Sequence, residues 1–129
     1  MIKKLIRKFN KSTPPIIDFQ YENTHYNRIS LISRAIISTQ KESSNYLEIG
    51  VQQCNCFNSI PLGAKFKTGV DPAIIEDESL RKMTSDDFFN QNKKKFDVIF
   101  IDGLHHYEQV FRDLKNSLNY LNEGGIILI

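Results

Sequence analysis

The chain has 129 residues, of which 40% are hydrophobic, 11% aromatic and 25% charged, a composition typical of one globular domain. Disordered, collagen-like and disulfide-rich classes of protein are therefore excluded. No stretch of eighteen or more apolar residues occurs, so the sequence predicts no transmembrane helix. The cysteines are Cys54 and Cys56 alone, and no secretory hydrophobic segment is present, so we expect a cytoplasmic protein.

The net charge of +2 hides an uneven distribution along the chain. Residues 1–11 contain five lysines and arginines and no acidic residue, whereas the rest of the chain has twelve basic and fifteen acidic residues. This mildly acidic body is unlike a domain with a basic face, and we expect no nucleic-acid partner. Residues 1–23 predict a short basic amphipathic helix and a linker. We favour a packed or free helix over membrane contact, because it has under three turns and no lipidation motif.

The remaining residues, 24–129, alternate between helix-like and strand-like patterns. Apolar residues at helical spacing indicate helices, and short apolar runs that end in glycine or proline indicate strands. Serine and aspartate at 85–87 indicate a helix start, because their side chains accept hydrogen bonds from the first free amides. The pattern predicts helices over 24–40 and 54–62, a helix beginning at Ser85, and strands over 46–51, 66–71 and, more weakly, 81–84.

The strongest strand pattern is the nearly unbroken apolar run FDVIFID (96–102), which is typical of a strand covered on both faces. A helix over 105–121 follows, with Glu108 and Arg112 paired on its solvent side. Residues 122–129 predict a turn and then a further buried strand. The apolar face of the 105–121 helix, which we expect to pack on the sheet, consists of Tyr107, Val110, Phe111, Leu114, Leu118 and Leu121.

Alternating strands and helices predict right-handed βαβ units and a parallel sheet, so the fold class is α/β. In open parallel sheets, ligands bind outside the carboxyl ends of the strands, where loop amides and helix N-termini converge. The polar residues and glycine at these ends are Glu48, Gly50, Asp71, Ser85, Asp86, Asp102, His105 and His106.

The second of these strands ends in Asp71, which lies 21 residues after Gly50. This spacing is close to the one that places a carboxylate on ribose hydroxyls in nucleotide-binding βαβ units. A carboxylate can accept two hydrogen bonds from a diol. The spacing therefore favours a nucleotide site, although acidic residues also end strands as helix caps.

Four segments together carry a family resemblance: YLEIGV (46–51), GVDP (69–72), FIDGLHHYE (100–108) and EGG (123–125). They resemble class I S-adenosylmethionine-dependent methyltransferases, more narrowly the small-molecule and sugar branch in which the fourth strand ends in Asp-Gly-x-His-x-Tyr-Glu. The resemblance covers residues 24–129. It implies a Rossmann-like, doubly wound, mainly parallel sheet in a three-layer αβα arrangement.

The resemblance also implies roles for the residues at the strand ends. Asp102 would lie near the transferred methyl group, and His105 is our candidate proton acceptor, so these two are the predicted catalytic residues. Methyl transfer needs alignment of an already activated methyl group more than a protein nucleophile. The predicted cofactor-binding residues are Glu48 and Gly50 at the methionine part, Asp71 at the ribose, Ser85 and Asp86 beside the adenine, and Asp102.

Three alternatives remain open at this point. Gln52 and Cys54 stand where family members usually have further glycines, which favours a non-catalytic remnant or interaction module as the second hypothesis. Asp102 and the two histidines are metal-ligand types, but we favour helix capping and assign no metal, although a divalent ion would suit these residue types. A nicotinamide-dependent oxidoreductase is disfavoured, because Gly50 does not begin a G-x-G-x-x-G motif.

The apolar run at 126–129 has a further implication. The family resemblance implies seven strands, so we expect this chain to lack the C-terminal strands. A sheet that ends at its fifth strand has an unpaired apolar edge. We therefore expect either a partner chain that covers this edge, such as a second copy in a homo-oligomer, or aggregation. We also expect a small-molecule acceptor whose identity depends on residues after the fourth and fifth strands.

Overall fold

The computed structural model describes residues 27–39 and 41–129. The predicted basic helix and linker at 1–23 lie outside these residues. None of the helices described from residue 27 onward is long and apolar enough to cross a membrane.

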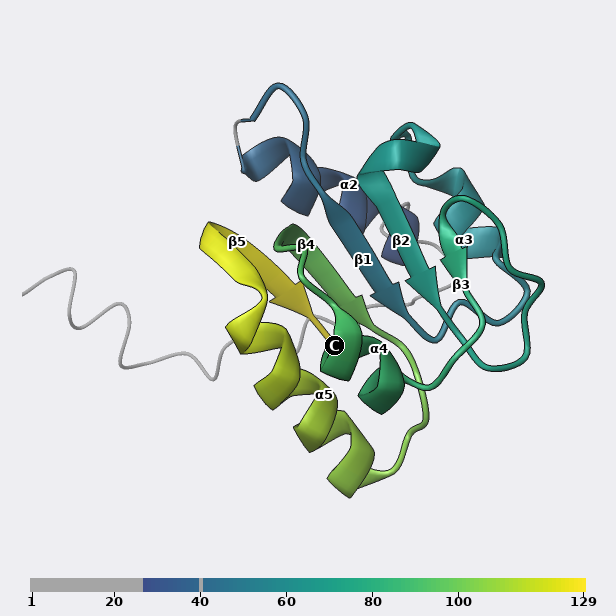
Figure 1. The fold of residues 1–129 in the computed structure, drawn as a ribbon. Helices are drawn as coiled ribbons and strands as arrows, with labels where there is room; N and C mark the ends of the chain where they lie inside the picture. Colours follow the sequence, from purple (N-terminus) through teal and green to yellow (C-terminus); the bar gives the residue numbers. More distant parts are fainter. Residues whose placement is uncertain (1–26, 40) are drawn as a thin grey trace, which may run out of the picture.

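A parallel sheet of five strands forms the centre of the fold (Figure 1), which confirms the α/β class. The strand order is β3-β2-β1-β4-β5, so the chain builds outward from β1 to β3 and then crosses to β4 on the other side of β1. The strand order therefore reverses between β1 and β4, which is where ligands bind in doubly wound sheets. The strands are β1 (Tyr46–Ile49), β2 (Lys67–Val70), β3 (Leu80–Arg81), β4 (Phe96–Ile101) and β5 (Leu121–Leu128).

Helices cover both faces of this sheet, with α2 and α3 on one side and α4 and α5 on the other (Figure 1). Alternate residues of β4 point to opposite faces, as strand geometry requires. Val98 and Phe100 pack with the first pair of helices, and Ile99 and Ile101 with the second. The three-layer prediction is therefore confirmed. The helices are α2 (Arg28–Ser38), α3 (Asn55–Ser59), α4 (Ser85–Gln91) and α5 (Tyr107–Asn119), with a 3-10 turn at Ala64–Phe66.

Strand β4 is buried along its whole length and lies between β1 and β5, as its apolar run predicts. Its second residue, Asp97, is buried near the amino ends of the strands. The Asp97 carboxylate accepts hydrogen bonds from Asn45 N at 2.8 Å and Asn122 Nδ2 at 2.8 Å, and it pairs with Lys41 Nζ. These contacts tie the segments that enter β1, β4 and β5 to one another.

The packing predicted for α5 is confirmed for Leu114 and Leu121, which contact the core on the α4 and α5 side, but is wrong for three other residues. Tyr107 is 78% exposed, and Phe111 and Leu118 are exposed too, whereas Asp113 and Ser117 are buried. The physical reason is that the sheet side of α5 is partly hollow and lined by polar side chains, while Tyr107 and Phe111 stack on each other outside with ring centroids 6.0 Å apart.

Several predicted details also change. The predicted helix does begin at Ser85, as α4, but its cap is Thr84, whose Oγ1 accepts a hydrogen bond from Asp87 N at 3.1 Å. Arg112 does not form the predicted pair with Glu108. Its Nε atom lies 3.6 Å from Asp86 Oδ2, and its Nη2 atom donates to Gln109 Oε1. The weak strand predicted at 81–84 is β3, which ends at Arg81.

The turn predicted at 122–125 is instead an irregular part of β5. The register with β4 jumps from Phe96 opposite Leu121 to Val98 opposite Ile126. In the described sheet β5 pairs with β4 alone, so it is an edge strand. The other predicted helices and strands agree with the structure within a few residues at each end.

Candidate functional site

Two cavities open at the carboxyl ends of the strands, beside the reversal between β1 and β4. Cavity A has a volume of about 420 Å³, and its lining includes Asp71, Ser85, Asp86, Gln109 and Asp113. Cavity B has a volume of about 340 Å³, and its lining includes Arg28, Glu48, Asn55, Cys56 and Ser59. Both cavities are lined by Gly50, Gln52 and Asp102, so they adjoin at these residues.

The structure brings most of the predicted site residues together. Gly50, Asp71, Ser85, Asp86 and Asp102 all line cavity A. Glu48, which the resemblance groups with them, lines cavity B instead.

The two neighbouring histidines lie outside both cavities. His105 is exposed, with its Nε2 atom 3.9 Å from Asp102 Oδ1, and His106 is exposed directly before α5. In the described residues, no group of three or more His, Cys, Asp and Glu side chains lies close enough to hold a metal ion.

Gly50 is required by the close approach of two strand ends. Its φ is +86°, and a Cβ at this position would lie 2.4 Å from both Asp102 O and Gly103 Cα. The backbone is held there by hydrogen bonds of 2.8 Å from Gly50 N to Val70 O and from Asp102 N to Ile49 O. Any side chain at residue 50 would push the β4 end away from the β1 end.

The loop after Gly50 keeps a glycine-type backbone without further glycines. Gln52 has φ +46° and Cys54 has φ +61°, in the left-handed region that L-residues seldom adopt. Such a conformation costs an ordinary residue about 1–2 kcal/mol. Asp71 helps to hold the loop, since its Oδ2 accepts from Gln52 N at 3.0 Å and its Oδ1 from Ala73 N at 2.8 Å. Gln52 and Cys54 therefore adopt a backbone conformation that glycine adopts more readily.

Glu48 is the buried acid of cavity B. Its Oε2 accepts a 2.6 Å hydrogen bond from Tyr46 Oη. Burial raises the pKa of Glu48 to about 7, although the hydrogen bond from Tyr46 acts in the opposite direction. Burial and the neighbouring Glu48 also raise the pKa of Tyr46, which stays protonated and donates. Glu48 can therefore gain or lose a proton near neutral pH.

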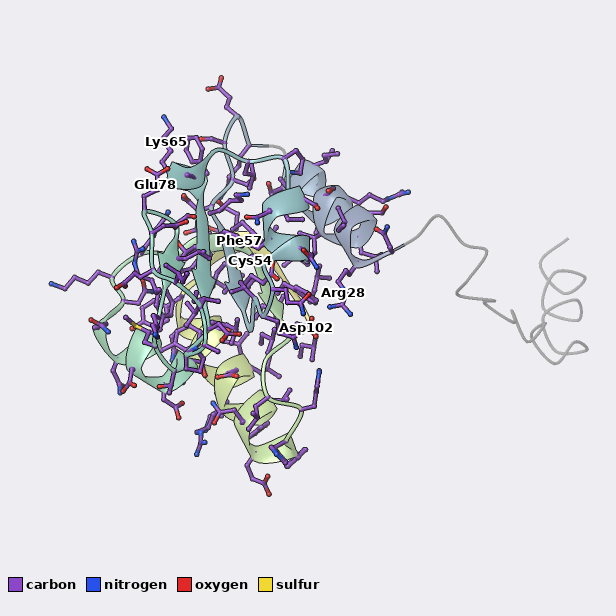
Figure 2. All side chains as sticks on the ribbon, turned by 90° about the vertical axis from the view of Figure 1, so that its right-hand side faces the viewer. Arg28, Cys54, Phe57, Lys65, Glu78 and Asp102 are labelled. Atoms are coloured by element: carbon purple, nitrogen blue, oxygen red, sulfur yellow. The ribbon has the colours of Figure 1, made fainter. Side chains whose placement is uncertain are left out.

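An ion pair joins α2 to the end of β4 at the border of the two cavities. Arg28 Nη1 contacts Asp102 Oδ2, and Figure 2 shows the two side chains next to each other at this end of the molecule. Arg28 is the first residue of α2. Because it lies in cavity B, it gives that cavity a cationic group opposite the acid Glu48.

The two cysteines near this site have the properties of inert thiols. Burial raises the pKa of Cys56 to about 11 and also raises the pKa of Cys54. A thiol with a raised pKa is a poor nucleophile and a poor metal ligand. This agrees with the apolar contacts that both residues make with the core on the α2 and α3 side.

Sequence reasoning missed two residues of cavity A, Gln109 and Asp113. Gln109 Nε2 donates to Ser85 Oγ and to Asp113 Oδ1, each at 3.1 Å. Their spacing of four residues on a helix is a signal that they share a face. Arg28 was missed as well, and no motif in the sequence marks it. Gly103 stands in the Asp-Gly-x-His-x-Tyr-Glu motif, but we assigned it no role.

Comparisons with known proteins agree with this geometry. Residues 65–129, which are half of the chain, match a family model described as a methyltransferase domain. An uncharacterized protein of Acanthamoeba polyphaga mimivirus is 28% identical over 116 residues, an alignment that covers 69% of this chain and 52% of the viral protein. The chain therefore spans about half the length of the curated relative it matches.

Proposed function

Because the chain belongs to a family of methyltransferase domains, we propose that it transfers a methyl group from S-adenosylmethionine to a small-molecule or sugar acceptor. The observation that carries this proposal is the pair of cavities that adjoin at Gly50, Gln52 and Asp102. S-adenosylmethionine has a nucleoside at one end and a zwitterionic amino acid at the other, with the sulfonium between them. Two adjoining cavities suit this elongated shape.

The nucleoside belongs in cavity A. Each oxygen of the Asp71 carboxylate accepts one backbone amide and keeps a further lone pair for a ribose hydroxyl. Gly103 supports the fit, since a Cβ there would lie 3.4 Å from Ile49 Cγ2 and 4.0 Å from Asp113 Oδ2. These are ordinary contacts, so the fold itself does not need a glycine at 103. A side chain there would instead fill space that a ligand can use.

The amino-acid end belongs in cavity B. Arg28 offers a guanidinium for the carboxylate of the ligand, and Glu48 offers a carboxylate for its ammonium group. The cofactor, when bound, supplies the activated methyl group. The contribution of the protein is to hold the sulfonium beside Asp102 and to exclude water from it.

Proton removal from the acceptor is the remaining task. His105 lies on the solvent side of Asp102, so an acceptor hydroxyl that approaches from solvent can pass its proton to this imidazole. A neutral histidine is a suitable acceptor near pH 7. His105 is therefore the proposed general base.

Calorimetry with S-adenosylhomocysteine tests the cofactor assignment. We expect binding by the wild-type protein and an affinity at least about tenfold lower for Asp71→Asn, because the amide nitrogen can accept neither a ribose hydroxyl nor the backbone amide that bonds this carboxylate oxygen. The matched acid-to-amide control is Glu78→Gln, which lies at the opposite end of the molecule from Asp102 in Figure 2 and should bind like the wild type. A folded wild-type sample that shows no binding would remove the cofactor from the proposal.

A second assay separates the enzyme from a non-catalytic module. Labelled S-adenosylmethionine is incubated with a small-molecule extract, with and without the protein. Transfer of label that is lost in His105→Ala supports the enzyme and its proposed base. Tight cofactor binding without transfer to any acceptor would favour the interaction module.

A further inference from the structure

One side of cavity A is formed by three hydrogen-bonded polar side chains, Ser85, Gln109 and Asp113, which we call the polar wall. Arg112 Nη2 donates to Gln109 Oε1 at 2.6 Å, and this contact fixes which way the Gln109 amide points. Both hydrogens of Gln109 Nε2 are then used, one on Ser85 Oγ and one on Asp113 Oδ1. The polar wall is thus held in one arrangement by Arg112 at the surface.

The arrangement leaves one donor and one acceptor available to a ligand. Ser85 Oγ already accepts from Gln109, so its own hydroxyl hydrogen is left to donate. Asp113 uses Oδ1 on Gln109, and its Oδ2 lies toward Gly103 in the cavity. A donor and an acceptor therefore lie side by side on the wall.

Asp113 needs a further partner. Its side chain is 1% exposed, and among the described residues it forms no ion pair with Lys, Arg or His. A buried carboxylate with one neutral donor is poorly compensated for the loss of water. Since the carboxylate lines cavity A, a ligand that donates a hydrogen bond there would supply the missing partner.

The rest of this cavity suits a flat ring. Apolar side chains line it from β1, β2 and the loops that follow β2, β3 and β4, and an apolar lining with a few placed polar groups is usual for small-molecule sites. These apolar residues are Ile49, Val70, Pro72, Met83 and Leu104.

We propose that the polar wall recognises the amino-bearing edge of adenine, with the exocyclic amine donating to Asp113 Oδ2 and the adjacent ring nitrogen accepting from Ser85 Oγ. A 6-aminopurine presents a donor next to an acceptor on this edge. A 6-oxopurine presents the reverse order, so it would set an acceptor against the Asp113 carboxylate. The polar wall would therefore select adenine over hypoxanthine.

This inference rests on the proposed cofactor and assigns its base recognition to Asp113. The resemblance places Asp86 beside the adenine instead. In the structure Asp86 is half-exposed and lies 3.6 Å from Arg112 Nε. It is therefore already engaged by a cation at the rim, whereas Asp113 is the acid within the cavity.

Calorimetry with two ligands tests the selection, S-adenosylhomocysteine and its deaminated analogue S-inosylhomocysteine. We expect the wild-type protein to bind the adenine form at least about tenfold more tightly, since the analogue leaves buried polar groups mismatched. In Asp113→Asn the side-chain amide can donate to a 6-oxo group, so the preference should fall to about equal affinity. Glu108→Gln is the matched control on α5, because Glu108 is exposed and lines neither cavity.

The ratio of the two affinities separates recognition from a general structural role. A structural defect would weaken both ligands together and keep the ratio. Ser85→Ala is a second variant, to be used if Asp113→Asn does not fold. Ser85 is the first residue of α4, and Thr84 supplies the cap of this helix. The substitution should also reduce the preference for the adenine form over the deaminated analogue. An unchanged ratio in the folded variants, or equal binding of both ligands by the wild type, overturns this inference and leaves the proposed function standing. Binding of neither ligand by the wild type overturns both.

Discussion

Asp97 and Glu48 are buried carboxylates on the neighbouring strands β4 and β1, and only 2% and 1% of their respective surfaces are exposed. Asp97 lies near the amino ends of the strands and Glu48 near the carboxyl ends. Burial on its own raises the pKa of Asp97, but hydrogen bonds from Lys41, Asn45 and Asn122 outweigh it and hold that pKa below its usual value. Burial raises the pKa of Glu48 to about 7, and among the described residues Tyr46 is the one side chain that donates to it.

The difference in pKa between Asp97 and Glu48 reflects different roles of the two ends of the sheet. At the amino end the acid is fully hydrogen-bonded by the protein, so it stabilises the fold. At the carboxyl end the acid is left short of donors beside a cavity, which costs stability and leaves it available to a ligand. The same contrast holds for Asp113, whose one described donor is Gln109. The predictions below test whether these carboxylates differ in this way.

Asp97→Ala should have the largest effect. Removing the carboxylate leaves the partly buried donors of Asn45 and Asn122 without an acceptor, so we expect the free energy of unfolding to fall by about 3 kcal/mol. The contribution of Asp97 is present above its unfolded-state pKa of 3.8 and is lost as pH falls through the lower folded-state pKa. Urea unfolding at pH 7 measures the change, with Glu78→Gln as the surface control. A loss below about 1 kcal/mol would mean that the three hydrogen bonds do not stabilise the sheet.

Glu48→Gln should have a smaller effect of opposite sign. The folded-state pKa of about 7 lies above the unfolded value of 4.5, so the folded protein holds the proton more tightly and stability falls as pH rises from about 4.5 to about 7. Glutamine has no such proton and can still accept from Tyr46. We expect the variant to be more stable than the wild type at pH 8 by on the order of 2 kcal/mol, and equally stable at pH 4.

Urea unfolding of both proteins across this pH range gives the measurement. The difference between the two curves isolates Glu48 from every other titrating group. If the two proteins lose stability in parallel from pH 4 to pH 8, Glu48 does not carry a raised pKa, and the contrast with Asp97 fails.

The sheet could be predicted from the sequence because its interior strands are short, apolar and bounded by glycine, proline or acidic residues. The strand ends in turn identified Gly50, Asp71, Ser85, Asp86 and Asp102, which all line cavity A. Parallel strands end at the same edge of a sheet, so residues far apart in the chain were grouped correctly without any knowledge of side-chain contacts.

The orientation of α5 could not be predicted in the same way. Helical periodicity assigns the apolar side to the sheet, and this fails where the helix borders a cavity lined by Gln109 and Asp113. Periodicity does not distinguish a hollow site from a packed core. The predicted cofactor-binding residues are divided between two cavities, with Glu48 in cavity B. This division likewise depends on packing that no local sequence pattern encodes.

Gln52→Gly should have the smallest effect and tests whether the carboxyl end of the sheet also stores backbone strain. Gln52 is exposed with φ +46°, so glycine relieves a left-handed residue without removing packing. We expect the free energy of unfolding to rise by up to about 1 kcal/mol. The reason is that removing the left-handed strain stabilises the folded state by more than the added backbone entropy of glycine stabilises the unfolded state. Gln53→Gly, at a neighbouring exposed residue without a positive φ, should instead lower it by about 0.5 kcal/mol. Equal losses in both variants, measured by urea unfolding, would mean that the loop after Gly50 carries no strain.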